Sequence, residues 1–61
     1  MQEKVLIIIP AYNEASTITQ LIKSLKSFND QWDIIIVNDG SSDETGTLAE
    51  ETGLVSVVNL P

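Results

Sequence analysis

The sequence predicts an α/β fold in which three parallel strands alternate with two helices, in the order β-α-β-α-β. Residues 5–9 and 34–37 are uninterrupted apolar runs rich in β-branched residues, which is typical of parallel strands covered on both faces. Between these runs, apolar residues recur with the period of a helix. We expect residues 1–61 to form a single partial domain. Its strands are expected near residues 4–9, 33–38 and 54–59, and its helices near residues 14–28 and 42–52.

Composition excludes several classes of protein. The net charge is −6 and arginine is absent, which argues against a nucleic-acid-binding module. At 43% hydrophobic residues, the chain is too apolar for a disordered acidic tail. Cysteine and histidine are both absent, so neither a disulfide nor the usual zinc ligands can reinforce a small core. We therefore expect an acidic, folded, soluble piece with a small core.

The first strand is expected to end at Pro10, which cannot donate a backbone hydrogen bond. Asn13 is the expected N-cap of the first helix, and Glu14 would lie in its first turn, where the helix dipole favours negative charge. Lys23 and Lys26 have the sign that suits the other end. The predicted buried stripe of this helix consists of Ile18, Leu21, Ile22, Leu25 and, at its end, Phe28.

The second strand leads into a turn at residues 38–40. Ser41 and Glu44 have the spacing of a capping box, so the second helix is expected to begin there. Gly46 weakens that helix by roughly 1 kcal/mol relative to alanine. Gly53 is a suitable residue to follow its C-terminus, and a third strand comes next.

This topology predicts an uncovered sheet face. If the three strands lie side by side in chain order, both right-handed crossovers place their helices on the same face. The other face then exposes apolar side chains of residues 5–9 and 34–37 to water, and such a patch normally marks an interface. Either further chain or a second copy would cover it.

Two polar segments follow the first two strands, at residues 10–14 and 38–43. Ligands of open parallel sheets bind at the carboxyl ends of the strands, where these segments lie. Tyr12 offers an aromatic face for a base, and Asp39 offers a carboxylate for a base N–H or a ribose hydroxyl. Free N–H groups at the start of the first helix would suit a diphosphate.

Each of these residues also has a simpler structural interpretation. Pro10 alone is a common strand terminator, and Asp39 followed by Gly40 is a common turn. Tyr12 alone would favour packing over ligand binding. Simple structural roles are also favoured for Ser41 and Asp43, as capping residues, and for Trp32, as a packing anchor ahead of the second strand.

Taken together, the two segments are more informative. Ile-Ile-Pro-Ala-Tyr-Asn-Glu at residues 8–14 and Ile-Val-Asn-Asp-Gly-Ser-Ser-Asp-Glu-Thr at residues 36–45 closely resemble the opening of family 2 glycosyltransferases. These are inverting, nucleotide-sugar-dependent enzymes of the GT-A fold. The resemblance extends over residues 5–58 and is strongest to the polyprenyl-phosphate (dolichol-phosphate) sugar transferases. It implies the N-terminal half of a GT-A fold, a three-layer-type, Rossmann-like parallel sheet.

The resemblance also implies site residues. Pro10, Ala11 and Tyr12 match the loop that lines the nucleotide, with the tyrosine near the base. Asp39 matches the aspartate that contacts the uracil or guanine, or its ribose. Glu14 matches a family glutamate close to the nucleotide. These five residues are the predicted substrate-binding set.

Other parts of the family's machinery have no counterpart in this sequence. The Asp-x-Asp element that holds the divalent metal is absent, and no residue matches the later catalytic base. Asp39 and Asp43 lie four residues apart and substitute poorly for the metal-binding pair. Many relatives have aspartate where this chain has Asn38, which changes the local charge but keeps the turn. We therefore expect no catalytic or metal-binding residue in this segment, and Mg²⁺ or Mn²⁺ only in the full-length enzyme.

Two hypotheses follow. In the first, the chain is the nucleotide-recognising part of a glycosyltransferase that uses a UDP- or GDP-sugar and is inactive as this segment alone. The full-length enzyme would be cytoplasmic or act at the cytoplasmic face of a membrane. Nothing in this sequence argues against its association with a membrane. In the second, the chain is a non-catalytic module that forms homo-oligomers through the uncovered sheet face. A dinucleotide-binding unit is disfavoured because no Gly-x-Gly-x-x-Gly follows the first strand.

Overall fold

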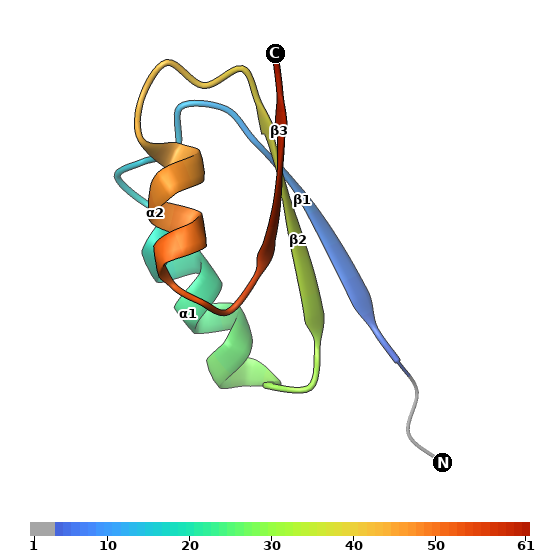
Figure 1. The fold of residues 1–61 in the computed structure, drawn as a ribbon. Coiled ribbons are helices and arrows are strands. Elements are labelled where there is room, and N and C mark those ends of the chain that lie inside the picture. The colour runs from blue at the N-terminus through green and yellow to red at the C-terminus, as the bar shows by residue number, and fades with distance from the viewer. Residues whose placement is uncertain (1–3) are drawn as a thin grey trace.

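The computed structural model describes residues 4–61, which form one parallel sheet with a helical layer on one side (Figure 1). The strands lie in the order β1-β2-β3, so each neighbours the next in the sequence. Both helices cover the same face, and the predicted β-α-β-α-β arrangement is confirmed. The elements in chain order are β1 (Leu6–Ala11), α1 (Ile18–Phe28), β2 (Asp33–Asp39), α2 (Thr45–Glu51) and β3 (Ser56–Leu60).

Strand register sorts the side chains onto two faces. Ile9 pairs with Ile36, and Ile36 with Val57, in a row that faces the helices. Because successive strand residues point to opposite faces, every second residue of each strand joins this side. The buried core consists of Ala11, Ile18, Ile22, Ile34, Ile36 and Ala49.

The opposite face of the sheet is open and apolar, as the topology predicts. Ile8 is 61% exposed and Leu6 is 55% exposed on β1, and Val58 on β3 is also exposed. On β2, Ile35 and Val37 occupy the same face and are half-buried between their neighbours. No described residue lies over this face, since both helices pack on the other one.

Strand β1 continues beyond its predicted end. It runs through Pro10 to Ala11, and Pro10 pairs in register with Val37. In the described part of the sheet β1 pairs only with β2, so half of its backbone N–H groups need no strand partner. A proline is tolerated in a strand at such a position.

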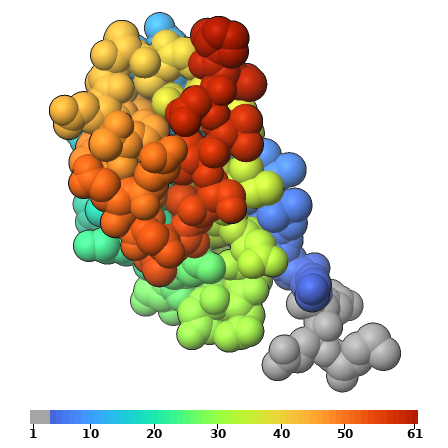
Figure 2. Space-filling view, in the orientation of Figure 1, coloured from blue at the N-terminus to red at the C-terminus, as the bar shows by residue number. Residues whose placement is uncertain are grey.

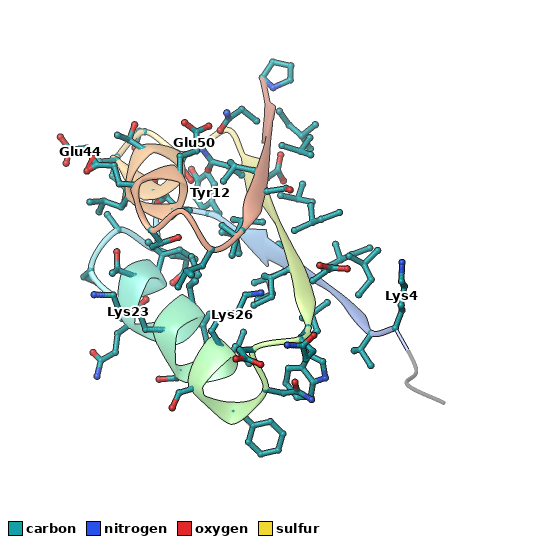
Figure 3. The ribbon with its side chains drawn as sticks, turned by 60° about the horizontal axis from the view of Figure 1, so that its bottom comes forward. Lys4, Tyr12, Lys23, Lys26, Glu44 and Glu50 are labelled. Atoms are coloured by element: carbon teal, nitrogen blue, oxygen red, sulfur yellow. The ribbon has the colours of Figure 1, made fainter. Side chains whose placement is uncertain are left out.

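Helix α1 begins at Ile18, four residues after the predicted start at residue 14. Asn13 has a left-handed backbone, with φ of 52°, and is not the N-cap. The N–H groups of Thr17 and Ile18 both donate to the Glu14 carbonyl, at 3.0 and 2.8 Å, and close a turn before the helix. Glu14 therefore lies outside the first helical turn. Lys26 does lie in the last turn, as predicted (Figure 3). Its Nζ donates to the Trp32 carbonyl.

The apolar stripe of α1 is narrower than predicted. Ile18 and Ile22 are fully buried and Leu25 packs against them, but Leu21 is exposed and Phe28 is 79% exposed. Phe28 instead packs on the half-buried ring of Trp32, with 5.1 Å between centroids. This contact gives Trp32 the anchoring role expected of it ahead of β2.

Helix α2 begins at Thr45, so the predicted Ser41–Glu44 capping box does not form. Its N-cap is Glu44, which makes no side-chain capping hydrogen bond and points outward (Figure 3). After the helix, Gly53 adopts φ of +68° and its N–H donates to the Glu50 carbonyl, so the predicted C-terminal glycine is confirmed.

Candidate functional site

Tyr12 and Asp39 lie at the carboxyl ends of two neighbouring parallel strands. Ala11 and Asn38 form the last register pair of β1 and β2, and Tyr12 and Asp39 follow them directly. Asp39 still pairs with Leu60 of β3. Both Tyr12, at 60%, and Asp39 are exposed. The structure thus brings the two predicted ligand-contacting residues to one edge of the sheet, where the β2–α2 loop (gold) meets the end of β3 (red) in Figure 2.

The loop after β1 is fastened to the loop after β2 by three consecutive backbone N–H groups. The N–H of Asn13 donates to Ser41 Oγ at 2.9 Å. The N–H of Glu14 donates to Thr45 Oγ1 at 2.8 Å, and that of Ala15 to Asp43 Oδ2 at 3.2 Å. These bonds join segments that lie about thirty residues apart in the chain.

Two hydrogen bonds donated in the opposite direction, from the second loop to the first, complete the connection. Asn13 Oδ1 accepts from the N–H of Ser42 at 2.9 Å and from its Oγ at 3.3 Å. The left-handed backbone of Asn13 is a conformation that asparagine tolerates better than most residues. We call Asn13, Ser41, Ser42, Asp43 and Thr45 the interloop cluster.

Thr45 and Asp43 are linked within this cluster. The fully buried Thr45 donates from its hydroxyl and from its N–H to Asp43 Oδ1, the latter at 3.0 Å. The hydroxyl bond is the main reason why the pKa of Asp43 is lowered, and the N–H groups of Thr45 and Ala15 act in the same direction. Partial desolvation opposes them, but the net effect holds the carboxyl group in its charged form.

This geometry corrects two expectations. The N–H groups of Asn13, Glu14 and Ala15 are not free for a diphosphate, because side chains of the β2–α2 segment already accept from them. The carboxylate of Asp43 is itself the anion that the loop binds. Ser41 accepts from Asn13 rather than from its own helix, whereas Asp43 accepts from Thr45 at the start of α2, as a capping residue does.

The other predicted site residues occupy distinct positions. Pro10 is exposed on the open sheet face, at the end of β1. Ala11 is 3% exposed, so its side chain belongs to the core and only its backbone lies near the loop. The side chain of Glu14 is exposed, while its backbone N–H is held by Thr45.

The turn after Asp39 depends on Gly40. Its φ of +68° lies in the left-handed region that L side chains rarely adopt, and its N–H donates to the Asn38 carbonyl at 3.2 Å. Asn38 points toward α2, where its Nδ2 donates to Asn59 Oδ1 at 3.0 Å and its Oδ1 is buried without a partner. Asn38 is therefore a packing residue beneath the site, and Asp39 alone offers its carboxylate to solvent at this turn.

Among residues 4–61, no three carboxylates lie close enough together to hold a metal ion. Both oxygens of Asp43 already accept hydrogen bonds. In the same described range, neither helix is long and apolar enough to cross a membrane.

Sequence reasoning missed Thr45 as the centre of the interloop cluster. A local signal was present, because Asp43 stands two residues before Thr45 at the start of a helix, the spacing of an aspartate turn. No sequence pattern indicated that the hydroxyl of Thr45 would also accept from the backbone N–H of Glu14 in the other loop.

The parallel sheet, with polar loops after the carboxyl ends of adjacent strands, places this chain in the class of open α/β proteins, whose ligands bind at that edge of the sheet. Comparisons with known proteins identify the family within this class. The family model of glycosyl transferase family 2 matches residues 6–61. This chain belongs to glycosyl transferase family 2.

Named relatives agree with this assignment. The undecaprenyl-phosphate 4-deoxy-4-formamido-L-arabinose transferase of Proteus mirabilis is 42% identical over 52 residues, which are 79% of this chain and 16% of that protein. The polyprenol monophosphomannose synthase of Mycolicibacterium smegmatis is 38% identical over 52 residues, covering 85% of this chain and 20% of that protein. The chain thus spans about a fifth or less of either relative.

A solved structure confirms the fold. Glucosyl-3-phosphoglycerate synthase of Mycobacterium tuberculosis, crystallised with Mn²⁺, UDP and phosphoglyceric acid, is similar to this chain with a TM-score of 0.79 and 31% identity. The match covers 92% of this chain and 20% of that one. The described residues therefore have the β-α-β-α-β arrangement of the GT-A fold.

Proposed function

We propose that this chain supplies nucleotide recognition to an inverting glycosyltransferase that transfers a sugar from a UDP- or GDP-sugar to an acceptor. The observation that carries the proposal is the position of the exposed Tyr12 and Asp39, which follow the last register pair of adjacent strands β1 and β2. Tyr12 offers a face on which a base can stack, and Asp39 accepts from a base N–H or from the ribose. Pro10, the backbone of Ala11 and Glu14 line the same loop.

We propose that the metal and base chemistry depends on other residues of a full-length enzyme. A similar structure was solved with Mn²⁺ and UDP, which supports a divalent metal in the full-length enzyme. Such an ion would neutralise the charge of the diphosphate leaving group. Residues 4–61 offer no cluster of three ligands that fits such an ion. We therefore propose that this segment alone recognises the nucleotide and does not catalyse transfer.

For the acceptor, we propose a polyprenyl phosphate. The support comes from the relatives, two of which are named for transfer to undecaprenyl phosphate or a polyprenol. An acceptor of this kind places the full-length enzyme at a membrane surface, and we propose the cytoplasmic face. The lack of cysteine is compatible with that compartment.

The nucleotide proposal is tested by titrating the chain with UDP and GDP, using calorimetry or ligand-observed NMR. We expect millimolar binding that Asp39→Ala abolishes, because the carboxylate that accepts from the base or ribose is gone. Asp33→Ala is the matched control, since Asp33 is an exposed aspartate at the opposite end of the same strand. Equal affinities of the wild type and Asp39→Ala would remove Asp39 from the site.

A second function is favoured by the open sheet face. Leu6, Ile8 and Val58 form an exposed apolar surface that two copies of the chain could bury against each other. We propose self-association through the part of this face around Leu6 and Ile8. These residues precede the end of β1 at which the loops lie, so this association is compatible with nucleotide binding. Light scattering, together with the nucleotide titration above, distinguishes the two candidate functions. A tight dimer in scattering that shows no nucleotide affinity in the titration would favour self-association as the sole function of this chain.

A further inference from the structure

We propose that Thr45 and Asp43 are positioning residues of the nucleotide site, which hold Tyr12 in place relative to Asp39 through the interloop cluster. This inference rests on the proposed nucleotide-binding function. It assigns a role in ligand recognition to two residues outside the predicted substrate-binding set.

Tyr12 depends on its neighbours for its position. It lies in a bend after β1 and is 60% exposed, so its own packing fixes it only weakly. The three residues that follow it each donate a backbone hydrogen bond to the β2–α2 segment. Tyr12 is thus held between strand β1 on one side and the interloop cluster on the other.

Asp39 belongs to the element on which the cluster is built. It is the last residue of β2, and Ser41, Asp43 and Thr45 follow it within six residues. The bonds that fasten the first loop therefore anchor it to the same segment that carries Asp39. Breaking them would leave both side chains present but free to move apart.

Thr45 is the residue on which the connection depends most. Its hydroxyl accepts from the Glu14 N–H and donates to Asp43 Oδ1, so it needs a group that does both. The side chain is fully buried, so water cannot readily replace the hydroxyl. Asp43, oriented by that hydroxyl, then accepts from the Ala15 N–H.

Preorganisation is the physical reason to expect an effect on affinity. A loop that is already ordered loses less conformational entropy when a ligand binds. A site whose supporting contacts are loosened keeps its residues but loses their relative geometry. We expect a weakening of the nucleotide Kd by about tenfold when the hydroxyl of Thr45 is removed.

The experiment compares Thr45→Val with Thr45→Ser in the full 61-residue chain. Valine has nearly the shape of threonine but cannot accept or donate, whereas serine retains the hydroxyl. Thr47→Val is the matched control, because Thr47 is an exposed threonine on the same helix. Two quantities are measured: the Kd for UDP and GDP by NMR titration, and hydrogen exchange at the amides of Asn13, Glu14 and Ala15.

We expect Thr45→Val to bind nucleotide about tenfold more weakly and to exchange its Glu14 and Ala15 amides at least tenfold faster. Thr45→Ser and Thr47→Val should behave as the wild type in both measurements. Should Thr45→Val fail to fold, Ser41→Ala is the alternative, because it removes only the acceptor of the Asn13 N–H. It should also weaken nucleotide binding and speed amide exchange in the loop, but by smaller factors.

Unchanged nucleotide affinity in a variant whose loop amides exchange faster would overturn the inference, because the cluster would then order the loop without serving the site. Unchanged exchange in Thr45→Val would also overturn it. A wild-type chain that binds neither UDP nor GDP would instead refute the proposed function, and the exchange data would then describe the loop alone.

Discussion

Asp43 accepts hydrogen bonds from the hydroxyl and N–H of Thr45 and from the N–H of Ala15, and these bonds lower its pKa below the ordinary value of 3.8. A group whose folded pKa is lowered stabilises the folded state fully above its unfolded pKa. That contribution is lost as the pH falls through the lower, folded value. The interloop cluster should therefore weaken only in acid, below about pH 3.8.

Comparison of Asp43→Asn with the wild type tests this pH dependence. We expect the wild type to be the more stable protein at neutral pH, by an amount that is constant down to about pH 5 and shrinks below pH 3.8. The measurement is denaturant unfolding at a series of pH values from neutral to below pH 3.8. Asp33→Asn serves as the control at an exposed aspartate. A stability difference that does not vary with pH would show that the charge of Asp43 is not involved.

The hydrogen-bond partners of single residues were the feature hardest to predict from the sequence. Asn13 and Ser41 both have the chemistry of helix caps, and the sequence offers each of them a helix to cap. In the structure each bonds the loop of the other instead. The energies of a local cap and of a tertiary hydrogen bond are similar, at about 1 kcal/mol each, so local pattern cannot decide between them.

At the scale of elements, Gly46 shows how packing overrides helix propensity. A Cβ added to Gly46 would lie 2.6 Å from Asn38 Nδ2 and 2.7 Å from Asn59 Oδ1, too close for either group to remain in place. The glycine that weakens α2 thus lets the helix approach β2 and β3. The close approach of α2 also packs Gly46 against the side chain of Asn38, which directly precedes the site residue Asp39.

We expect Gly46→Ala to destabilise the protein by about 1–3 kcal/mol, although alanine favours a helix by about 1 kcal/mol over glycine. The measurement is the free energy of unfolding in urea. Thr47→Ala, at an exposed position of the same helix, should be neutral or slightly stabilising. A stabilised Gly46→Ala variant would mean that α2 can shift away from the asparagine pair without loss.

The elements themselves were largely predictable, because each follows from one periodic or continuous apolar pattern. Five elements in the predicted order are present among residues 4–61. Their ends were predicted less well: α1 starts at Ile18 and α2 at Thr45, both later than expected. Before α2, Ser41 to Asp43 belong to the interloop cluster. Before α1, the N–H groups of residues 13–15 donate to that cluster instead of entering the helix.

At the scale of the whole molecule, the open sheet face governs association. Ile8 lies midway along the edge strand β1 of this face, pairs with Ile35 and is 61% exposed, so a lysine there would disturb the monomer little. We expect light scattering to give a dimer for the wild type and a monomer for Ile8→Lys, because a buried lysine in the interface is unpaired. Phe28→Lys, at an exposed residue of α1, should remain dimeric. A monomeric wild type at every concentration would contradict self-association through this face.

The sequence by itself determined the order of the elements, the two polar segments and the strand ends at which they lie. These features depend on apolar patterning and on the direction of parallel strands, which are local or topological properties. Only the tertiary structure decided how the two loops are joined and which hydrogen bonds their polar residues make. That choice depends on atoms about thirty residues apart meeting within 3 Å, as Glu14 and Thr45 do. The family could therefore be read from the motifs, but the role of Thr45 beneath them could not.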